Sequence, residues 1–147
     1  MHVIRFARTP EERELAFLVR RKVFMEEQRI LAALDVDELD YLEGTRHLLI
    51  LTQTGDVVGT LRFRPYDSER IAKVERLAVL APYRKVGAGR ELMLYVEMAA
   101  RAAGFHILCV AVQTYARRFY EVLGYQAEGE TFQEADVEHI FMKKTIK

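Results

Sequence analysis

The segment Arg84-Lys85-Val86-Gly87-Ala88-Gly89 decides the fold, because it joins an apolar strand to an amphipathic helix. The strand is expected over residues 71–80, which are rich in Val, Leu and Ile, and Pro82 follows it. Apolar residues then recur at helical spacing over residues 90–103. The sequence therefore predicts a strand, a tight basic loop and a helix in succession.

The loop places glycines and cations at the start of the predicted helix. The first backbone N–H groups of a helix lack intrahelical partners and carry partial positive charge. Gly87 and Gly89 have no Cβ, so an anion can approach these N–H groups closely. Arg84, Lys85 and Arg90 add full positive charges. The combination predicts a phosphate-binding loop, and a helix capped by a Gly-rich turn is the alternative.

Two better-known phosphate loops do not fit this segment. The Walker loop requires Gly-Lys-Ser/Thr, which is absent here. The dinucleotide fingerprint requires a third glycine where Leu92 stands, and no acidic residue lies near position 110 to bind a ribose.

Length and composition limit the class of protein. The 147 residues predict a single domain over residues 1–147, and 50% hydrophobic with 30% charged residues is a globular balance. A formal net charge of zero argues against a nucleic-acid partner. No apolar run approaches the roughly 18 residues of a membrane span, which predicts no membrane partner. The single cysteine, Cys109, predicts a buried structural thiol and a cytoplasmic location.

The remaining segments alternate between strand and helix signals. Thr9, Pro10 and Glu12 predict the start of a helix that runs to about Gln28. A short helix and an acidic loop are expected over residues 30–44, with the carboxylates at a soluble surface or, alternatively, attracting a cationic amine. The other expected elements are strands at 3–7, 46–53, 57–64 and 105–112, a helix at 115–123, and a final β pair at 125–128 and 131–144.

This order predicts a mixed α/β class (α+β), with a mixed, mostly antiparallel central sheet and helices on both faces. Two stretches, "ERLAVLAPYRKVGAG" and "QTYARRFYEVLGY", resemble the GNAT N-acetyltransferases. "RRKVFMEEQ" and "FQEADVEHIFMKK" are similar to the YjcF/ElaA-like branch of that superfamily. The resemblance implies the GNAT acyl-CoA N-acyltransferase fold and covers almost the whole chain.

The resemblance implies transfer of acetyl from acetyl-CoA to a primary amine of a small molecule or protein, by direct attack in a ternary complex. It implies that the backbone of Leu77 and Val79 binds pantetheine. The pyrophosphate would be held by Arg84, Lys85, Val86, Gly87, Ala88, Gly89 and Arg90. The alternative is an acyl-CoA-binding sensor or structural homo-oligomer without turnover, and a homodimer remains an open expectation. No metal is expected, because the sequence has no transition-metal ligand set or calcium loop.

Acetyl transfer needs a base for the amine and a donor for the leaving thiolate. The resemblance implies Glu75 as the base and Tyr120 as the acid. Glu75 in an ion pair with Arg62 or near Arg76, and Tyr120 as a core aromatic, are the structural alternatives. His47 and His139 are alternative bases or substrate contacts. A substrate rim is expected from Arg20, Phe24 and Glu27.

Overall fold

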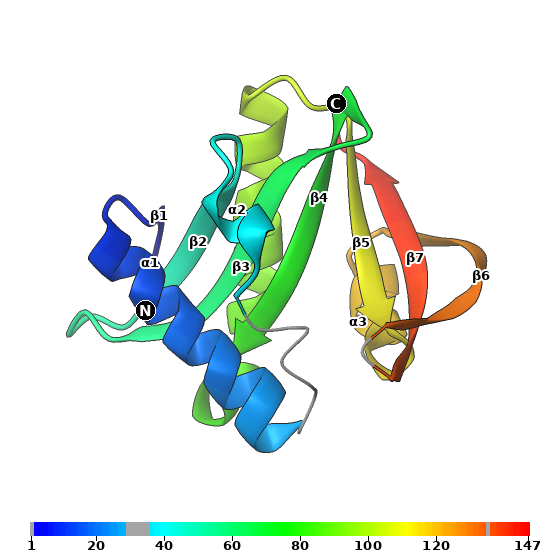
Figure 1. Ribbon diagram of the computed structural model, residues 1–147. Helices are drawn as coiled ribbons and strands as arrows, with labels where there is room; N and C mark the ends of the chain where they lie inside the picture. The colour runs from blue at the N-terminus through cyan, green and yellow to red at the C-terminus, as the bar shows by residue number, and fades with distance from the viewer. Residues whose placement is uncertain (1, 29–35, 135) are drawn as a thin grey trace.

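The computed structural model describes residues 2–28, 36–134 and 136–147 (Figure 1). In these residues seven strands form one sheet, in the order β1-β2-β3-β4-β5-β7-β6. Neighbouring strands are antiparallel except β4 and β5, which are parallel. The strands are β1 Val3–Phe6, β2 Arg46–Leu51, β3 Val57–Tyr66, β4 Ser68–Val79, β5 Ile107–Gln113, β6 Gln126–Glu134 and β7 Val137–Thr145. The predicted mixed, mostly antiparallel sheet is confirmed.

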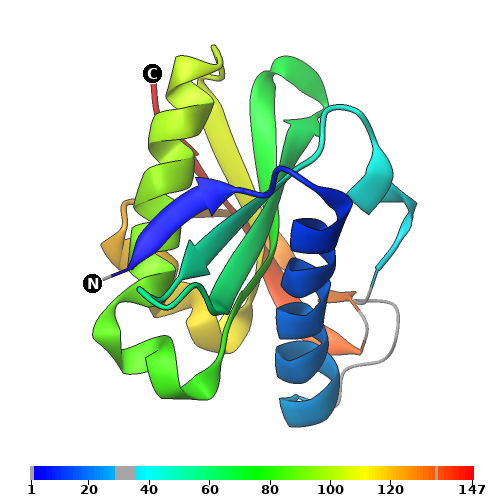
Figure 2. The ribbon, with the colours of Figure 1, turned by 90° about the vertical axis from the view of Figure 1, so that its left-hand side faces the viewer.

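Helices cover both faces of this sheet (Figure 2). Helix α1, Pro10–Arg20, continues as the π-helical turns η1, Arg21–Glu27, and packs on β3 and β4. Helix α2, Ala88–Ala102, lies on the opposite face, where α3, Arg117–Val122, joins it in the core. Short 3₁₀ segments η3 Glu38–Tyr41, η4 Ala81–Val86 and η5 Thr114–Ala116 complete the described elements.

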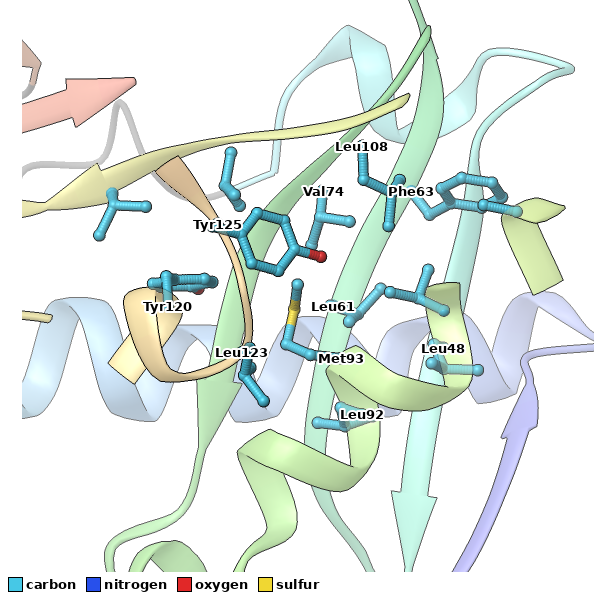
Figure 3. Close-up of a cluster of buried hydrophobic side chains, with 14 of the residues drawn as sticks. Leu48, Leu61, Phe63, Val74, Leu92, Met93, Leu108, Tyr120, Leu123 and Tyr125 are labelled. Carbon is cyan, nitrogen blue, oxygen red and sulfur yellow. The ribbon is translucent and has the colours of Figure 1, made fainter. Parts of the chain in front are cut away.

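The main core lies between α2 and the sheet (Figure 3). Leu92, Met93 and Val96 supply the apolar stripe that the helical spacing predicted, and each is fully buried. They meet the sheet residues Leu48 and Leu61, which are also fully buried. Burial of this apolar surface fixes α2, and therefore the loop at its start, against the centre of the sheet.

The sequence features expected at helix ends are present at the start of α1 and at the end of α2. The Thr9 hydroxyl accepts a hydrogen bond from the Glu12 N–H at 3.1 Å, which caps α1 as predicted. Gly104 follows α2 with φ of 94°, in the left-handed region that glycine adopts readily. Leu108, Cys109, Val110 and Val112 of β5 are buried, and burial raises the pKa of the Cys109 thiol to about 11.

Strands β4 and β5 diverge along their length. They pair from Ile71 with Ile107 to Val74 with Val110, and no further pair is formed between them in the described residues. Figure 1 shows the two strands separating toward their C-terminal ends. The divergence opens the sheet at its centre, between the C-terminal halves of β4 and β5.

One residue of β4 interrupts the pairing with β3 at the same level. Arg62 lies opposite Glu75, whereas Thr60 lies opposite Ala78, so β4 holds one extra residue. Arg76 lies inside this bulge with φ of 59°, a left-handed conformation that is uncommon for residues with a Cβ.

Among the described residues, no helix is long and apolar enough to span a membrane.

Candidate functional site

Two adjoining cavities form a groove that runs from the start of α2 into the opening between β4 and β5. The outer cavity has a volume of about 320 Å³, and the inner cavity one of about 170 Å³. Gln28, Leu77, Tyr115 and Phe119 line both cavities. The groove can therefore hold one extended ligand along the C-terminal half of β4.

The outer cavity ends at the basic loop. Gly87 caps α2 with φ of 85°, and no side chain of the described residues caps the first N–H groups of this helix. Arg84 and Arg90 line this cavity together with Gly87 and Gly89. The Arg84 Nε–H donates to the Val79 carbonyl at 2.8 Å, which ties the loop to the end of β4. The arrangement places helix N–H groups and cations at one end of the groove, where an anion could bind.

The other predicted loop residues take different places. Lys85 and Val86 are exposed in η4, and Ala88 is fully buried under the loop. A Cβ on Gly89 would lie 3.4 Å from Phe119 Cζ, so the helix start packs closely on the aromatic wall of the groove. Val79 also lines the outer cavity, and Leu77 lines both.

Tyr120 lies at the inner end of the groove. Helix α3 places its ring against Tyr125, with ring centroids 5.8 Å apart (Figure 3). The ring also contacts Phe119. The residue is 7% exposed and lines the inner cavity. Burial raises the pKa of the Tyr120 hydroxyl well above its usual range, so the hydroxyl keeps its proton at neutral pH. A buried neutral hydroxyl at this position can donate a hydrogen bond to a ligand.

Glu75 lies in the same inner cavity, within a cluster of cations. Arg62 donates to Glu75 Oε1 at 2.8 and 3.1 Å, Arg64 donates to it at 2.6 Å, and Lys73 Nζ lies 3.3 Å from Oε2. Burial opposes ionisation, but the Arg64 hydrogen bond and the charges of Arg62 and Lys73 outweigh it and lower the pKa of Glu75 to about 2. The ion-pair alternative with Arg62 is thus present in the structure.

His139 lines the inner cavity from β7. Its Nδ1 lies 2.7 Å from the Val137 carbonyl oxygen, which can only accept a hydrogen bond, so Nδ1 carries a proton. The Nε2 of the neutral ring therefore holds a lone pair. Glu134 Oε2 lies 3.4 Å from this Nε2 and can stabilise the ring once it is protonated. Both residues line the inner cavity.

The remaining predicted substrate residues separate into two groups. Phe24 is buried and lines the inner cavity. Arg20 and His47 instead lie in a buried cluster beneath α1: Arg20 binds Asp40 at 2.7 and 3.1 Å, and His47 Nε2 lies 3.1 Å from the Asp40 carbonyl. Burial lowers the pKa of His47. The Glu27 side chain lies outside the described residues.

The prediction of a soluble surface for the acidic loop is wrong for Asp40, which is 1% exposed. Arg20 and Arg62 turn it inward, with Arg62 Nη1 3.0 Å from Oδ1. Burial opposes ionisation, but the hydrogen bond and charge of Arg20 hold the pKa of Asp40 well below its usual range. Asp35 of the same loop lies outside the described residues.

Several residues of the groove were not identified from the sequence. Glu134, Gln28 and Tyr115 line it, and the Tyr115 hydroxyl accepts from Gln28 Nε2 at 2.9 Å. The sequence could have indicated them only because they lie close, along the chain, to segments that were already expected near the site. Among the described residues, no group of three or more His, Cys, Asp or Glu side chains is arranged to hold a metal ion.

The chain is similar in sequence to acetyltransferases of the GNAT family. The family described as acetyltransferase (GNAT) domain matches residues 17–146. The chain is 37% identical to the uncharacterized protein YyaT of Bacillus subtilis, over 89% of this chain and 87% of that protein. It is 33% identical to the uncharacterized N-acetyltransferase YjcF of the same species, over 94% and 96%.

Solved structures give the same fold. Escherichia coli ElaA has a TM-score of 0.86 at 20% identity and covers 98% of this chain and 99% of its own. An aminoglycoside 6'-N-acetyltransferase complexed with coenzyme A has a TM-score of 0.79 at 19% identity, with 99% and 97% covered. At these identities the structures establish the fold alone.

The ion pairs of Glu75 predict a pH-dependent contribution to stability. We expect Glu75→Gln to lower the free energy of unfolding at pH 7 by about 3 kcal/mol, which corresponds to the pKa shift from 4.5 to about 2. Because the folded-state pKa is depressed, the contribution is present above the unfolded-state pKa and is lost as pH falls toward 2. The difference between the two proteins should therefore shrink below pH 5.

Urea unfolding at pH 7, 5 and 4 measures this difference. Glu121→Gln is the matched control, because Glu121 forms a half-exposed pair with Arg117 at 3.3 Å and should change stability by less than about 0.5 kcal/mol. A Glu75 difference that stays constant with pH would contradict the assignment.

Proposed function

This chain belongs to the GNAT acetyltransferase family, and on that premise we propose that it transfers acetyl from acetyl-CoA to a primary amine by direct attack in a ternary complex. One observation carries the proposal: a single groove joins a helix N-terminus suited to phosphate to an opening between two strands where Tyr120 and His139 lie. A long ligand with phosphate at one end and a reactive group at the other matches that groove.

The proposed place for the pyrophosphate is the loop. The N–H groups of Ala88, Gly89 and Arg90 begin α2, and the Gly87 conformation leaves open space where a Cβ would stand. The Arg84 and Arg90 side chains add charge at the same end of the groove. A structural neighbour of the same fold was crystallised with coenzyme A, which supports the choice of this ligand class.

Pantetheine is proposed to run along β4. From Glu75 onward the edge of β4 that faces β5 has no strand partner in the described residues. An amide-containing chain can pair with such an edge as an added strand. The backbone of Leu77 and Val79 would make these bonds, and the thioester would then lie at the inner cavity.

The proposed chemistry divides two tasks between two side chains. His139 Nε2 accepts the proton of the attacking amine, and the Glu134 carboxylate at 3.4 Å stabilises the resulting imidazolium. The amine nitrogen bonds to the carbonyl carbon, and the C–S bond breaks with its electron pair going to sulfur. Tyr120 donates a hydrogen bond to that thiolate, which then takes a proton from solvent. Its raised pKa favours hydrogen bonding over full proton loss.

Glu75, the base implied by the resemblance, has a different role in this proposal. A carboxylate whose pKa is about 2 holds protons too weakly to be an effective base at neutral pH. Its contacts with Arg62 and Arg64 of β3 instead fix β4 against β3. We therefore assign proton acceptance to His139.

The loop assignment predicts a charge-specific loss of binding. Gly87→Asp should weaken acetyl-CoA binding by at least tenfold, because a carboxylate would stand where the pyrophosphate is expected. Gly87→Asn is the matched control: it has the same shape and tolerates the same left-handed backbone, but it carries no charge. Calorimetry on both folded variants measures the affinities, and equal affinities for Asp and Asn would refute the assignment.

The base assignment predicts a change in the pH–rate profile. His139→Gln should lower kcat/KM by roughly 10²–10⁴-fold, the usual scale of general acid–base catalysis, and should flatten the acidic limb. His106→Gln, before β5, is the control and should leave the profile intact. If the limb survives in His139→Gln but disappears in Glu75→Gln, Glu75 is the base instead.

The Tyr120 assignment separates an enzyme from a sensor. Tyr120→Phe should lower kcat about tenfold to a thousandfold with little change in acetyl-CoA affinity, because the hydroxyl acts on the leaving group. Tyr125→Phe is the control, since the Tyr125 hydroxyl binds Glu97 at 2.9 Å in the core and should affect stability instead. Full kcat in a folded Tyr120→Phe would refute the role. Tight acetyl-CoA binding without turnover over a broad amine panel would favour the sensor.

A further inference from the structure

We infer that Asp37 is a positioning residue for the acyl group, because through Arg76 it holds the bulge that keeps β4 apart from β5. The inference rests on the proposed function, since it takes the opening between these strands as the acyl site. It assigns a role in the reaction to a carboxylate of the acidic segment that precedes β2.

The backbone at Arg76 needs support from the rest of the fold. Glu75 and Ala78 of β4 are three positions apart in sequence, whereas Arg62 and Thr60, their partners on β3, are two positions apart. Arg76 takes up the extra length with φ of 59°. Residues with a Cβ rarely hold this conformation unless surrounding contacts enforce it, and glycine holds it readily.

Asp37 supplies such contacts at the bulge. Its Oδ2 accepts from Arg76 Nη2 at 3.2 Å, and its Oδ1 accepts from Arg62 Nη1 at 2.8 Å. Arg62 also donates to Glu75 Oε1, so one network holds both Glu75 and Arg76. The Asp37 carboxylate is itself fixed, because it accepts from the Leu39 N–H at 3.0 Å at the start of η3.

The bulge lies where the groove needs β4 to be separate. The pairing of β4 with β5 ends at Val74, one residue before the bulge begins. If the extra residue were lost from the bulge, the register of the following residues would shift by one and their side chains would change faces. Leu77, which lines both cavities, is the first residue affected. Loss of the contacts from Asp37 should therefore displace the acyl carrier while the core remains folded.

Four variants of the full chain test this inference: Asp37→Asn, Arg76→Ala, Arg76→Gly, and the double variant with Asp37→Asn and Arg76→Gly. Asparagine keeps the Leu39 contact but weakens the ion pair. We expect Asp37→Asn and Arg76→Ala each to raise the Kd for acetyl-CoA and lower kcat by at least tenfold. Both variants that carry Arg76→Gly should stay within about threefold of the wild type, because glycine holds the left-handed bulge without the contacts from Asp37.

Amide hydrogen exchange gives a second measurement that needs no ligand. Collapse of the bulge should alter exchange at Ala111 and Val112 of β5 in Asp37→Asn and Arg76→Ala, and leave it unchanged in the two variants that carry Arg76→Gly. Equal impairment in Arg76→Ala and Arg76→Gly, or an unaffected Asp37→Asn, would overturn the inference. A wild type that neither binds acetyl-CoA nor transfers acetyl would instead overturn the proposed function, and the exchange pattern would still decide whether Asp37 holds the bulge.

Discussion

The end of the β4–β5 ladder at Val74 and Val110 is the constraint on which the site depends. Backbone N–H and C=O groups require partners, so a sheet opened at its centre exposes groups that water or a ligand must satisfy. The opening is stable because each strand is held on its other side, β4 by β3 and β5 by β7. The apolar core under α2 then keeps the two halves together below the opening.

A network of buried charges lies beneath α1, next to the part of β4 that has no partner in β5 among the described residues. Arg62 contacts Asp37, Asp40 and Glu75, which come from a loop, a 3₁₀ turn and a strand. A buried ion network of this kind often adds less stability than apolar residues of similar volume, because each charge must be desolvated. Its contribution here is to position segments relative to one another, since the Arg62 guanidinium alone contacts three of them. One of these segments, β4, lines the inner cavity through Glu75.

Local periodicity was sufficient to predict the central strand, loop and helix, because Gly87 and the apolar stripe of α2 act within a few residues of themselves. It was insufficient for Asp40 and Glu75. Their arginine partners lie 11 to 22 residues away in sequence, so local periodicity does not show these ion pairs. The bulge was also missed, since Arg76 occupies a position where a glycine would have indicated a left-handed backbone. Phe24, Tyr120 and His139 line one cavity, whereas Arg20 and His47 pack elsewhere.

The physics of burial explains why the proposed chemistry uses His139 and Tyr120. A carboxylate can remain charged in a dry groove only when cations surround it, and those cations remove its basicity, as they do for Glu75. An imidazole needs no such counter-charge before the reaction, because its neutral form already carries the lone pair that takes the proton. A buried phenol likewise enters the reaction neutral and donates without ionising. In the proposed reaction, Glu134, which is partly exposed and 3.4 Å from His139, supplies a negative charge beside the imidazolium that forms. The proposed reaction thus uses groups that can enter it in their neutral forms, and it places a charge of opposite sign where charge develops.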